Sequence, residues 1–577
     1  MIDRDEKWMV TRVRWVIPVL LGILSALSDS IVKTNGAIDV HDNVLYVRLL
    51  LAVLLFLGVF AVVDRLFRSA PLFLSASRPT SDEGHVGVTV RRIAASLRVF
   101  LFTPRSFCML WAFVFVCWLP YVTSLNPGVY WSDTSQQLIE YYGGIPMTDH
   151  HPYLTTLIIG WFSDLGKALF RSTSGGLYLL IWLQVASATA VFAALIIEVR
   201  ESGVGKAICA ALLGFVAICP FFPVMFSSLV KDTLSAVLFL AFCLQFFKAI
   251  RTRGASLRSV KTVVLITVFA VLCSLTKKTM GYVVIPSMLL LLILVGKSIA
   301  WRNMLVASIA AVIIVFAVVP KLLLPLAGVA PGGKQEMIAT LIQQVAHDVI
   351  HDDGSMSDED KQLINDFLIH DTNQIPSLYD FEIVDPIKGR SVKDDSLFAP
   401  FVGLWARKTI QNPFGHFEAW LGLVHGWFGF YNKDGSPNYM VVCTESLWFD
   451  KGIDNYVDWP GEPDDSSIAV RTIYDWYQGL PVLSALFFRS TWGSIVPSVL
   501  VFIALRNRKG AMSRLILAAP FVLIALTLMI TPVSGMGGEP TRYLFPLVCS
   551  APFVMALLGV SSHGSIPRHA KPIRVTE

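Results

Sequence analysis

The chain has 577 residues, of which 54% are hydrophobic and 15% are charged. Soluble domains carry about 25% charged residues. This composition, together with a mean hydropathy of +0.61, therefore excludes an ordinary soluble enzyme and indicates a polytopic membrane protein. The net charge of +5 is the sum of basic loops and an acid-rich segment, so it does not argue for a nucleic-acid partner.

Apolar runs that are long enough to cross a bilayer recur along the chain. A spanning helix needs about 17 to 25 apolar residues, because lipid offers the backbone no hydrogen-bond partners. By this criterion we expect about twelve transmembrane helices in an all-α membrane fold. The runs begin near Val13, Val44, Phe107, Gly176, Ala207, Thr233, Val260, Gly281, Met304, Leu483, Leu515 and Tyr543.

Basic residues predict the orientation of these helices. Lysine and arginine are concentrated in intervals between the runs that fall on one side of the membrane if every run crosses. Those intervals are 65–105, 248–261, 297–302 and 506–514. Because cytoplasmic loops are rich in lysine and arginine, we expect both termini in the cytoplasm and the acid-rich segments outside.

The predicted organisation follows from these runs. It comprises two leading helices with a basic loop at 1–105, a membrane core at 106–325 with an external catalytic loop at 125–174, an external domain at 326–481, the last transmembrane helices at 482–562 and a cytoplasmic tail at 563–577. The external domain is rich in aspartate, which indicates a folded helical or loop-rich unit, or a large lid, rather than a linker. Within it, the apolar segment 417–431 is too short to span, so we expect an interfacial helix there.

Asp133 is the most informative residue, since it lies in Asn126-Pro-Gly-Val-Tyr-Trp-Ser-Asp133, directly after an apolar run. An enzyme that transfers a group to a hydroxyl needs a carboxylate or an imidazole to accept the proton as the new bond forms. A carboxylate at the outer membrane surface could fill that role. The alternative is that Asp133 only caps a short helix that begins at Thr134, as aspartate often does.

Further side chains in the same outer loop are candidates for this chemistry. Glu140 follows Asp133, and Asp149-His150-His151-Pro152 supplies a second acid and adjacent imidazoles. Adjacent histidines suit a metal poorly, because both must face one point, so interfacial hydrogen bonding is the alternative that we favour. The sequence carries no clear cofactor motif, and a divalent cation stays open.

Cationic side chains stand at the predicted outer ends of later helices, in Lys231-Asp232, Lys277-Lys278 and Glu539-Pro-Thr-Arg542-Tyr543. The simplest interpretation is snorkelling at the interface. However, ionisable residues at membrane depth are costly and tend to mark function, and several cations around one aqueous pocket would suit a lipid phosphate. We therefore predict that Lys231, Lys278 and Arg542 converge in one cavity, where Arg542 can hold a phosphate bidentately.

Taken in order, these motifs resemble a bacterial family of multi-pass proteins, DUF6020, which in turn looks like a branch of the GT-C glycosyltransferases. The resemblance runs from about residue 106 to residue 550 and leaves out the leading helices. It implies further substrate contacts among the aromatic and amide neighbours of Asp133 and in the external domain. These candidates are Tyr130, Gln137, Gln344, Tyr379, Asp380, Asp385 and Lys388.

The resemblance implies a sugar donor linked to a polyprenyl phosphate, a glycan, lipid or protein acceptor, and a catalytic carboxylate at Asp133 on the outer face. Several GT-C branches carry paired acids at this place, and the lack of an Asp-Glu or Asp-x-Asp pair here keeps metal dependence open. The alternative function is a transporter or flippase for a lipid-linked saccharide. A transporter places ionisable groups near the bilayer midplane and often has repeated halves, whereas these charges gather at the outer helix ends.

Overall fold

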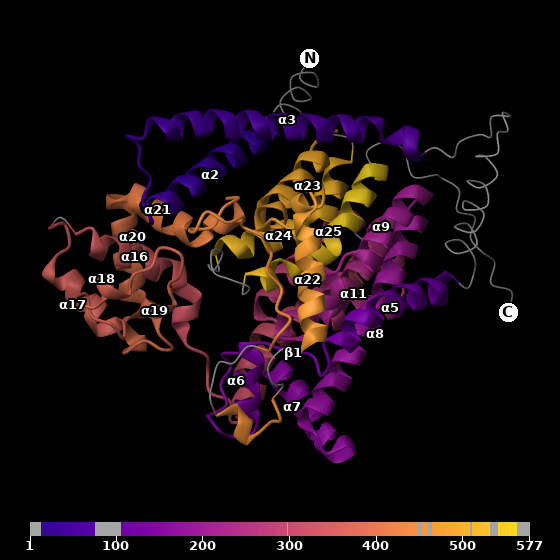
Figure 1. Ribbon diagram of the computed structural model, residues 1–577, viewed down its shortest axis with the longest axis horizontal. Helices are drawn as coiled ribbons and strands as arrows, with labels where there is room; N and C mark the ends of the chain where they lie inside the picture. The colour runs from indigo at the N-terminus through magenta and orange to yellow at the C-terminus, as the bar shows by residue number, and fades with distance from the viewer. Residues whose placement is uncertain are drawn as a thin grey trace.

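The computed structural model describes residues 13–74, 106–296, 298–352, 354–446, 452–459, 464–507, 510–530 and 540–561. These residues are mostly helical, and the sheet among them pairs two short parallel strands. Figure 1 shows a large group of long helices and, at its left, a smaller lobe of shorter helices. The helical class predicted from composition is therefore confirmed.

Nine of the described helices are long and apolar enough to cross a membrane. They are α2 (Val16–Lys33), α3 (Asn43–Leu74), α5 (Ser106–Ser124), α8 (Thr173–Glu201), α11 (Lys231–Arg251), α13 (Gly281–Val295), α14 (Ile299–Ile313), α24 (Ala511–Ile530) and α25 (Thr541–Ser561). The span that contains α13 begins with a 3-10 turn, η2 (Lys278–Met280), and the span that contains α14 continues through a π-helical stretch, η3 (Ile314–Leu323), and α15 (Leu324–Leu326). This set is compatible with a multi-pass membrane protein.

Shorter apolar helices occupy the other predicted runs in the described part of the chain. They are α9 (Lys206–Ile218), α12 (Val260–Thr276) and α23 (Val496–Ala504), the last preceded by a π-helical turn, η9 (Thr491–Ile495). Each predicted run therefore contains an apolar helix. However, α9, α12 and α23 have 13, 17 and 9 residues, at or below the lower limit of about 17 for a spanning helix. The number of membrane crossings stays a prediction.

The smaller lobe contains only part of the predicted external domain. Its helices are α16 (Ala339–Ile350), α17 (Asp358–Phe367), α18 (Ile375–Leu378), α19 (Asp385–Lys388), α20 (Phe398–Gln411) and α21 (Pro413–Val424). They surround a small apolar core, in which the rings of Phe367 and Phe401 stack with their centroids 4.5 Å apart. α22 (Asp465–Gly479) instead packs against α5, so the segment predicted as one external domain is divided between the lobe and the membrane helices.

The apolar segment 417–431 consists of the second half of α21 and the turn after it. α21 packs against α16 and α2, and residues 421–429 are all buried. This differs from the interfacial helix predicted for the segment. Its apolar side chains are covered by neighbouring helices, which a sequence pattern cannot distinguish from cover by lipid.

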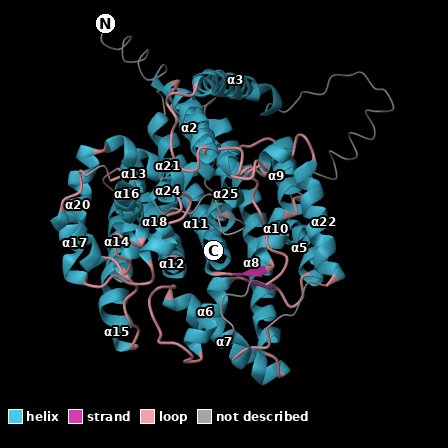
Figure 2. Ribbon diagram, turned by 60° about the vertical axis from the view of Figure 1, so that its left-hand side comes forward, coloured by secondary structure: helices cyan, strands magenta, loops and turns pink. Residues whose placement is uncertain are grey.

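A short parallel sheet joins the segment 125–174 to the helix bundle. β1 (Val129–Tyr130) pairs with β2 (Ser228–Leu229), with Val129 opposite Ser228. β1 leads into α6 (Ser132–Tyr141) and then α7 (Tyr153–Phe170), whereas β2 follows α10 (Phe221–Phe226) and leads into α11. Figure 2 shows both strands beside α8, with α6 below them.

Aromatic side chains pack the helices together next to this sheet. The Trp118 ring of α5 stacks on Phe226 of α10 with centroids 5.5 Å apart, and Phe226 contacts Phe545 of α25 at 4.7 Å. All of these rings are buried. Because such buried rings hold helices in a defined arrangement, the N-terminal ends of α6, α11 and α25 are positioned relative to one another.

Candidate functional site

The site begins where the two strands end. Trp131 alone separates β1 from α6, and Val230 alone separates β2 from α11. Parallel strands deliver the following segments to the same edge, so the first turns of α6 and α11 lie side by side. Asp133 in one turn and Lys231 in the other form an ion pair with 2.7 Å between Oδ2 and Nζ.

Asp133 is not a capping residue. The N-cap of α6 is Trp131, which makes no side-chain cap hydrogen bond, and Asp133 lies within the first turn of the helix. Its carboxylate is directed toward cations from other segments. The interpretation of Asp133 as a cap for a helix starting at Thr134 is therefore wrong, although a carboxylate in the first turn still complements the helix dipole.

Arg542 supplies the second cation. It lies in the first turn of α25, is buried, and contacts Asp133 Oδ2 through Nη1. The same nitrogen lies 3.8 Å from Asp232 Oδ2, and Nη2 donates a hydrogen bond of 3.2 Å to the Tyr543 hydroxyl. The guanidinium also lies 5.9 Å from the centroid of the Trp131 ring, so one arginine bridges both acids.

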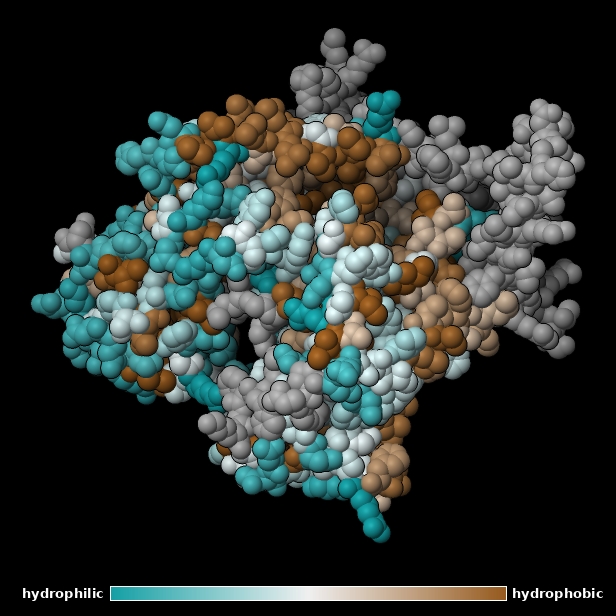
Figure 3. All heavy atoms as spheres, in the orientation of Figure 1, coloured by the Kyte–Doolittle hydropathy of each residue, from teal (hydrophilic) through white to brown (hydrophobic). Residues whose placement is uncertain are grey.

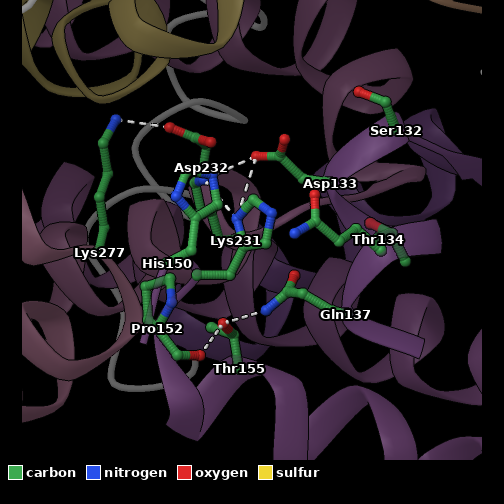
Figure 4. Close-up of polar contacts among 12 residues, drawn as sticks. Ser132, Asp133, Thr134, Gln137, His150, Pro152, Thr155, Lys231, Asp232 and Lys277 are labelled. Atoms are coloured by element: carbon green, nitrogen blue, oxygen red, sulfur yellow. Dashed lines mark hydrogen bonds and ion pairs between the residues drawn. The ribbon is translucent and has the colours of Figure 1, made fainter. Parts of the chain in front are cut away.

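Asp232 and Lys277 form a second, more deeply buried ion pair. Lys277 Nζ lies 2.5 Å from Asp232 Oδ1, and the Asp232 side chain has no solvent exposure. The ammonium also lies 5.1 Å from the centroid of the Tyr543 ring. Figure 4 shows this pair next to Asp133 and Lys231, whereas Ser132 lies apart from the group. The charged cluster therefore consists of Asp133, Lys231, Asp232, Lys277 and Arg542, with His151 beside it.

His151 is a neutral partner of the cluster. Its Nδ1 lies 3.1 Å from Lys231 Nζ. Burial, followed by the nearby charge of Lys231, holds the pKa of this imidazole well below its usual value. Because an ammonium only donates hydrogen bonds, Nδ1 is the acceptor and Nε2 carries the proton. Nε2 is buried without a hydrogen-bond partner among the described residues, so it is a donor that a bound ligand could use.

The environment keeps Asp133 ionised. Burial by itself would raise the pKa of the Asp133 carboxyl, but the charges of Lys231 and Arg542 outweigh it and hold the pKa well below its ordinary value. Cations within a few ångströms stabilise the carboxylate form more than partial burial destabilises it. The carboxylate is consequently a weak base as long as both cations remain on it.

Lys278 does not join the cluster, contrary to the predicted convergence of Lys231, Lys278 and Arg542. It is about half exposed and pairs with Asp149, with 2.8 Å between Nζ and Oδ2. Lys277 takes its place because Lys277 follows the end of α12 in an extended conformation, φ −150° and ψ 109°. Successive side chains point to opposite sides of an extended backbone, so Lys277 turns inward and Lys278 turns outward.

Other candidates near Asp133 hold the loop together and make no contact with the cluster in the described structure. Glu140 accepts a hydrogen bond of 3.0 Å from Thr148, and burial raises the pKa of its carboxyl. The Gln137 amide donates to Thr155 at 2.7 Å. The Tyr130 hydroxyl donates to the carbonyl of Pro127 at 3.0 Å.

The lobe approaches the site at one place. The segment after η3 meets the segment 125–174, where the backbone N–H of Asp149 donates a 2.7 Å hydrogen bond to the carbonyl of Ala330. Farther along, Lys388 binds Glu336 at 2.5 Å and Asp385 at 2.9 Å. Burial is the main cause that lowers the pKa of the His150 imidazole. The charge of Glu336 raises this pKa, and the charge of Lys388 lowers it. Lys388 therefore acts on the site through its charge, and Asp385 pairs with Lys388.

The remaining candidates of the lobe stabilise its own packing. The Gln344 amide donates to the carbonyl of His416 at 2.8 Å and accepts from the Trp405 indole at 2.7 Å. The Asp380 carbonyl accepts from Gln343 at 2.7 Å, and burial raises the pKa of the Tyr379 phenol. These contacts do not reach the cluster. Glu539 lies outside the described residues.

The cluster is suited to an anion. Its carboxylates are already paired with ammonium and guanidinium groups, and in the described part of the chain no group of three or more His, Cys, Asp or Glu side chains is arranged to hold a metal ion. The residues that sequence reasoning overlooked are Trp131, whose ring faces Arg542, and Glu336, which binds Lys388. Trp131 could have been proposed from the sequence, because it lies in the motif that contains Asp133.

Comparisons with known proteins give one match. A model of a family described as a family of unknown function (DUF6020) matches residues 144–571. The matched residues include Lys231, Lys277 and Arg542 but begin after Asp133, so the resemblance expected from residue 106 is confirmed from residue 144 onward. No curated protein and no solved structure matches the chain.

Proposed function

Because the chain belongs to the DUF6020 family and holds Asp133 between Lys231 and Arg542, we propose that it is an integral-membrane glycosyltransferase of the GT-C type. The donor would be a sugar linked to a polyprenyl phosphate, and the acceptor a glycan, lipid or protein of the cell envelope on the outer face of a bacterial plasma membrane. The observation that supports the proposal is the buried carboxylate that pairs with cations from separate helices. Ionisable groups at membrane depth cost free energy, and they tend to occur where they serve a function.

The cations would bind the donor phosphate. Lys231 and Arg542 both bind the Asp133 carboxylate, so both already line a position that holds an anionic oxygen. A phosphate offers more acceptor oxygens than a carboxylate, and arginine can bind two of them at once. The phosphate would therefore replace Asp133 on Lys231 and Arg542, while the polyprenyl chain stays in the bilayer.

This exchange would activate Asp133. Once Lys231 and Arg542 turn to the phosphate, the charges that lower the pKa of Asp133 are partly neutralised, and the carboxylate becomes a stronger base. The acceptor hydroxyl oxygen then forms the glycosidic bond to the anomeric carbon, and the bond from that carbon to the phosphate oxygen breaks. The proton passes to Asp133, and the electron pair leaves with the lipid phosphate, whose charge Lys231 and Arg542 stabilise. Direct displacement inverts the anomeric centre.

The acceptor would lie on the side of His150 and His151. The buried Nε2–H of His151 has no partner in the described structure, so it can donate to an acceptor or sugar hydroxyl. Asp149 with Lys278 and Glu336 with Lys388 provide polar groups farther out. Polar groups of both signs suit the hydroxyls of a saccharide, which donate as well as accept.

The test is to supply the purified full chain with candidate polyprenyl-phosphate sugars and cell-envelope acceptors. We expect release of free polyprenyl phosphate together with an equal amount of glycosylated acceptor. A flippase would instead move the lipid-linked saccharide across vesicle membranes and release no free polyprenyl phosphate. That second result would overturn the proposal in favour of transport.

Sidedness has its own test, because the mechanism requires the loop at 149–151 to lie outside. A membrane-impermeant thiol reagent should label a cysteine introduced at Asp149 in intact cells and should not label one introduced at Arg253. The expectation follows from the basic residues of the interval 248–261, since such residues favour the cytoplasmic side. Labelling of position 253 from outside would contradict the predicted orientation.

A further inference from the structure

The leading hairpin of α2 and α3 is fastened to the rest of the protein at both ends. At one end, Asp64 of α3 is buried and lies 3.1 Å from Arg14 and 3.3 Å from Arg506. At the other end, the backbone N–H of Ile38, in the turn between α2 and α3, donates a 2.6 Å hydrogen bond to Glu418 of α21. The turn between α2 and α3 is therefore held against α21 of the lobe.

A cavity of about 380 Å³ lies at this junction. It is built from the last turn of α2, the first turns of α3 and the turn that follows η6 (His425–Trp427). Its lining residues are Asp29, Val32, Lys33, Arg48, Tyr431, Asn432, Lys433 and Gly435. Hydrogen bonds inside the turn, such as Asn432 N–H to the Ser436 carbonyl at 2.8 Å, give that wall of the cavity a defined shape.

The cavity carries cations that hold no carboxylate in an ion pair. Lys33, Arg48 and Lys433 come from three segments, and within the described residues none of them forms an ion pair or a side-chain hydrogen bond. Lys433 has one other contact, with its ammonium 5.1 Å from the centroid of the Phe381 ring. In the charged cluster, by contrast, Lys231 and Lys277 each hold a carboxylate. The charges of Lys33 and Arg48 act on Asp29, the one acidic residue of the lining. The three cations outnumber it, so the cavity keeps a positive potential that attracts an anion.

Asp29 adds an acceptor at the floor of the cavity. Its Oδ1 is buried and has no hydrogen-bond partner among the described residues, and it lies in a side chain that also receives a backbone hydrogen bond from Phe430. A buried acceptor without a partner costs free energy that a ligand donor can recover. The cavity therefore combines cations for a phosphate with an acceptor for a neighbouring hydroxyl.

Apolar surface continues directly from the cavity. Around Arg48, the helix α3 exposes Val44, Val47 and Leu51, and α2 and α3 are both long and apolar enough to cross a membrane. In Figure 3, hydrophobic residues cover α3 along the top of the molecule, and hydrophilic residues gather at its left end. A ligand that fits both surfaces has a charged headgroup and hydrocarbon chains.

We propose that this cavity binds the phosphate headgroup of a membrane lipid. Arg48, Lys33 and Lys433 hold the phosphate, Asp29 accepts a hydrogen bond from a headgroup hydroxyl, and the acyl chains lie along α3. The site is separate from the charged cluster, because in Figure 1 the turn between α2 and α3 and the helix α6 lie at different ends of the molecule. One wall lies on the leading hairpin, which precedes the residues matched by the family model, and the other wall, at 431–435, lies within them.

The test uses the purified full chain in detergent and native mass spectrometry to count bound molecules. The probes are phosphatidylglycerol, a diacylglycerol with the same chains and no phosphate, and glycerol phosphate, which has no chains. We expect retention of phosphatidylglycerol and weak binding of the other two. Each cation contributes a charge-assisted hydrogen bond, so the double variant Arg48→Gln, Lys433→Gln should bind phosphatidylglycerol about a hundredfold more weakly.

The matched control is Lys393→Gln, which removes a lysine of the lobe that is already paired with Asp371 at 2.7 Å. It should leave lipid binding unchanged. If the double variant fails to fold, Arg48→Lys keeps the charge but loses the bidentate grip, and it should weaken binding about tenfold. Equal binding of the diacylglycerol, equal binding of glycerol phosphate, or full binding by the folded variants would each overturn the proposal.

Discussion

Replacement of Asp133 by asparagine tests the proposed exchange between Asp133 and the donor phosphate. The asparagine side chain has the same size but carries no charge, so Lys231 and Arg542 lose the anion that they share. Removing one partner of a buried ion pair costs about 3–5 kcal/mol of stability. Since only 14% of the Asp133 side chain is exposed, we expect a loss in that range for the ligand-free protein.

The same change should affect binding and turnover in opposite directions. Two unit charges 4 Å apart attract by about 4 kcal/mol near a protein surface, and this attraction between Asp133 and its cations competes with the donor phosphate. Without the competitor, the affinity for polyprenyl phosphate should rise by at least about tenfold. Loss of the proton acceptor should lower turnover by about 10²- to 10⁴-fold.

The assay combines thermal unfolding, calorimetric titration with polyprenyl phosphate, and turnover with a donor sugar. The control is Asp458→Asn, because Asp458 accepts hydrogen bonds from the backbone N–H groups of Thr173 and Ser174 at 2.7 and 3.0 Å and does not touch the cluster. That variant should lose stability without a change in phosphate affinity. Near-normal turnover in Asp133→Asn, or weaker binding of polyprenyl phosphate, would refute the reasoning.

Three further predictions concern Arg542, the pair of Lys277 and Lys278, and the pH dependence of Asp133. Arg542→Lys keeps the charge but loses the bidentate grip, so the KM for the donor should rise about tenfold, while Arg471→Lys, at the exposed pair with Asp475, should leave it unchanged. Lys277→Gln removes the nearer cation from buried Asp232 and leaves it only Arg542, at 3.8 Å, so it should cost about 3–5 kcal/mol in unfolding experiments. Lys278→Gln removes a half-exposed ion pair and should cost at most about 1 kcal/mol. The pKa of Asp133 is lowered in the folded state. The ionised Asp133 therefore stabilises the folded protein fully above its unfolded pKa of about 3.9, and this stabilisation is lost as the pH falls through the folded pKa. As the pH is lowered below about 3.9, the unfolding temperature should fall less in Asp133→Asn than in the parent protein.

The sequence predicted those features that depend on neighbouring residues along the chain. Long runs of apolar residues predicted the positions of the long helices, because a chain in lipid must satisfy its backbone hydrogen bonds within each segment. Residue type also identified Asp133, Lys231 and Arg542 as candidates, because charged side chains at membrane depth are rare and need a reason. All three meet in the structure.

Other assignments depend on which segments pack together. Gln344, Tyr379 and Asp380, which the resemblance implies as substrate contacts, lie in the lobe and do not reach the charged cluster, so their role stays a prediction. A buried amide and a binding amide have the same sequence signature, since both need a hydrogen-bond partner. The choice between Lys277 and Lys278 depended on the extended backbone at the end of α12, which the apolar pattern does not report.

The sequence by itself determined that the chain is an apolar, mostly helical protein with charges at helix ends, because hydropathy and residue type follow from composition and local order. Tertiary structure alone decided which of those charges meet. Asp133 and Arg542 are 409 residues apart in the chain, and their contact requires the pairing of β1 with β2 and the aromatic packing that holds α5, α10 and α25 together. Such long-range contacts depend on the summed packing of many residues, so no local pattern encodes them.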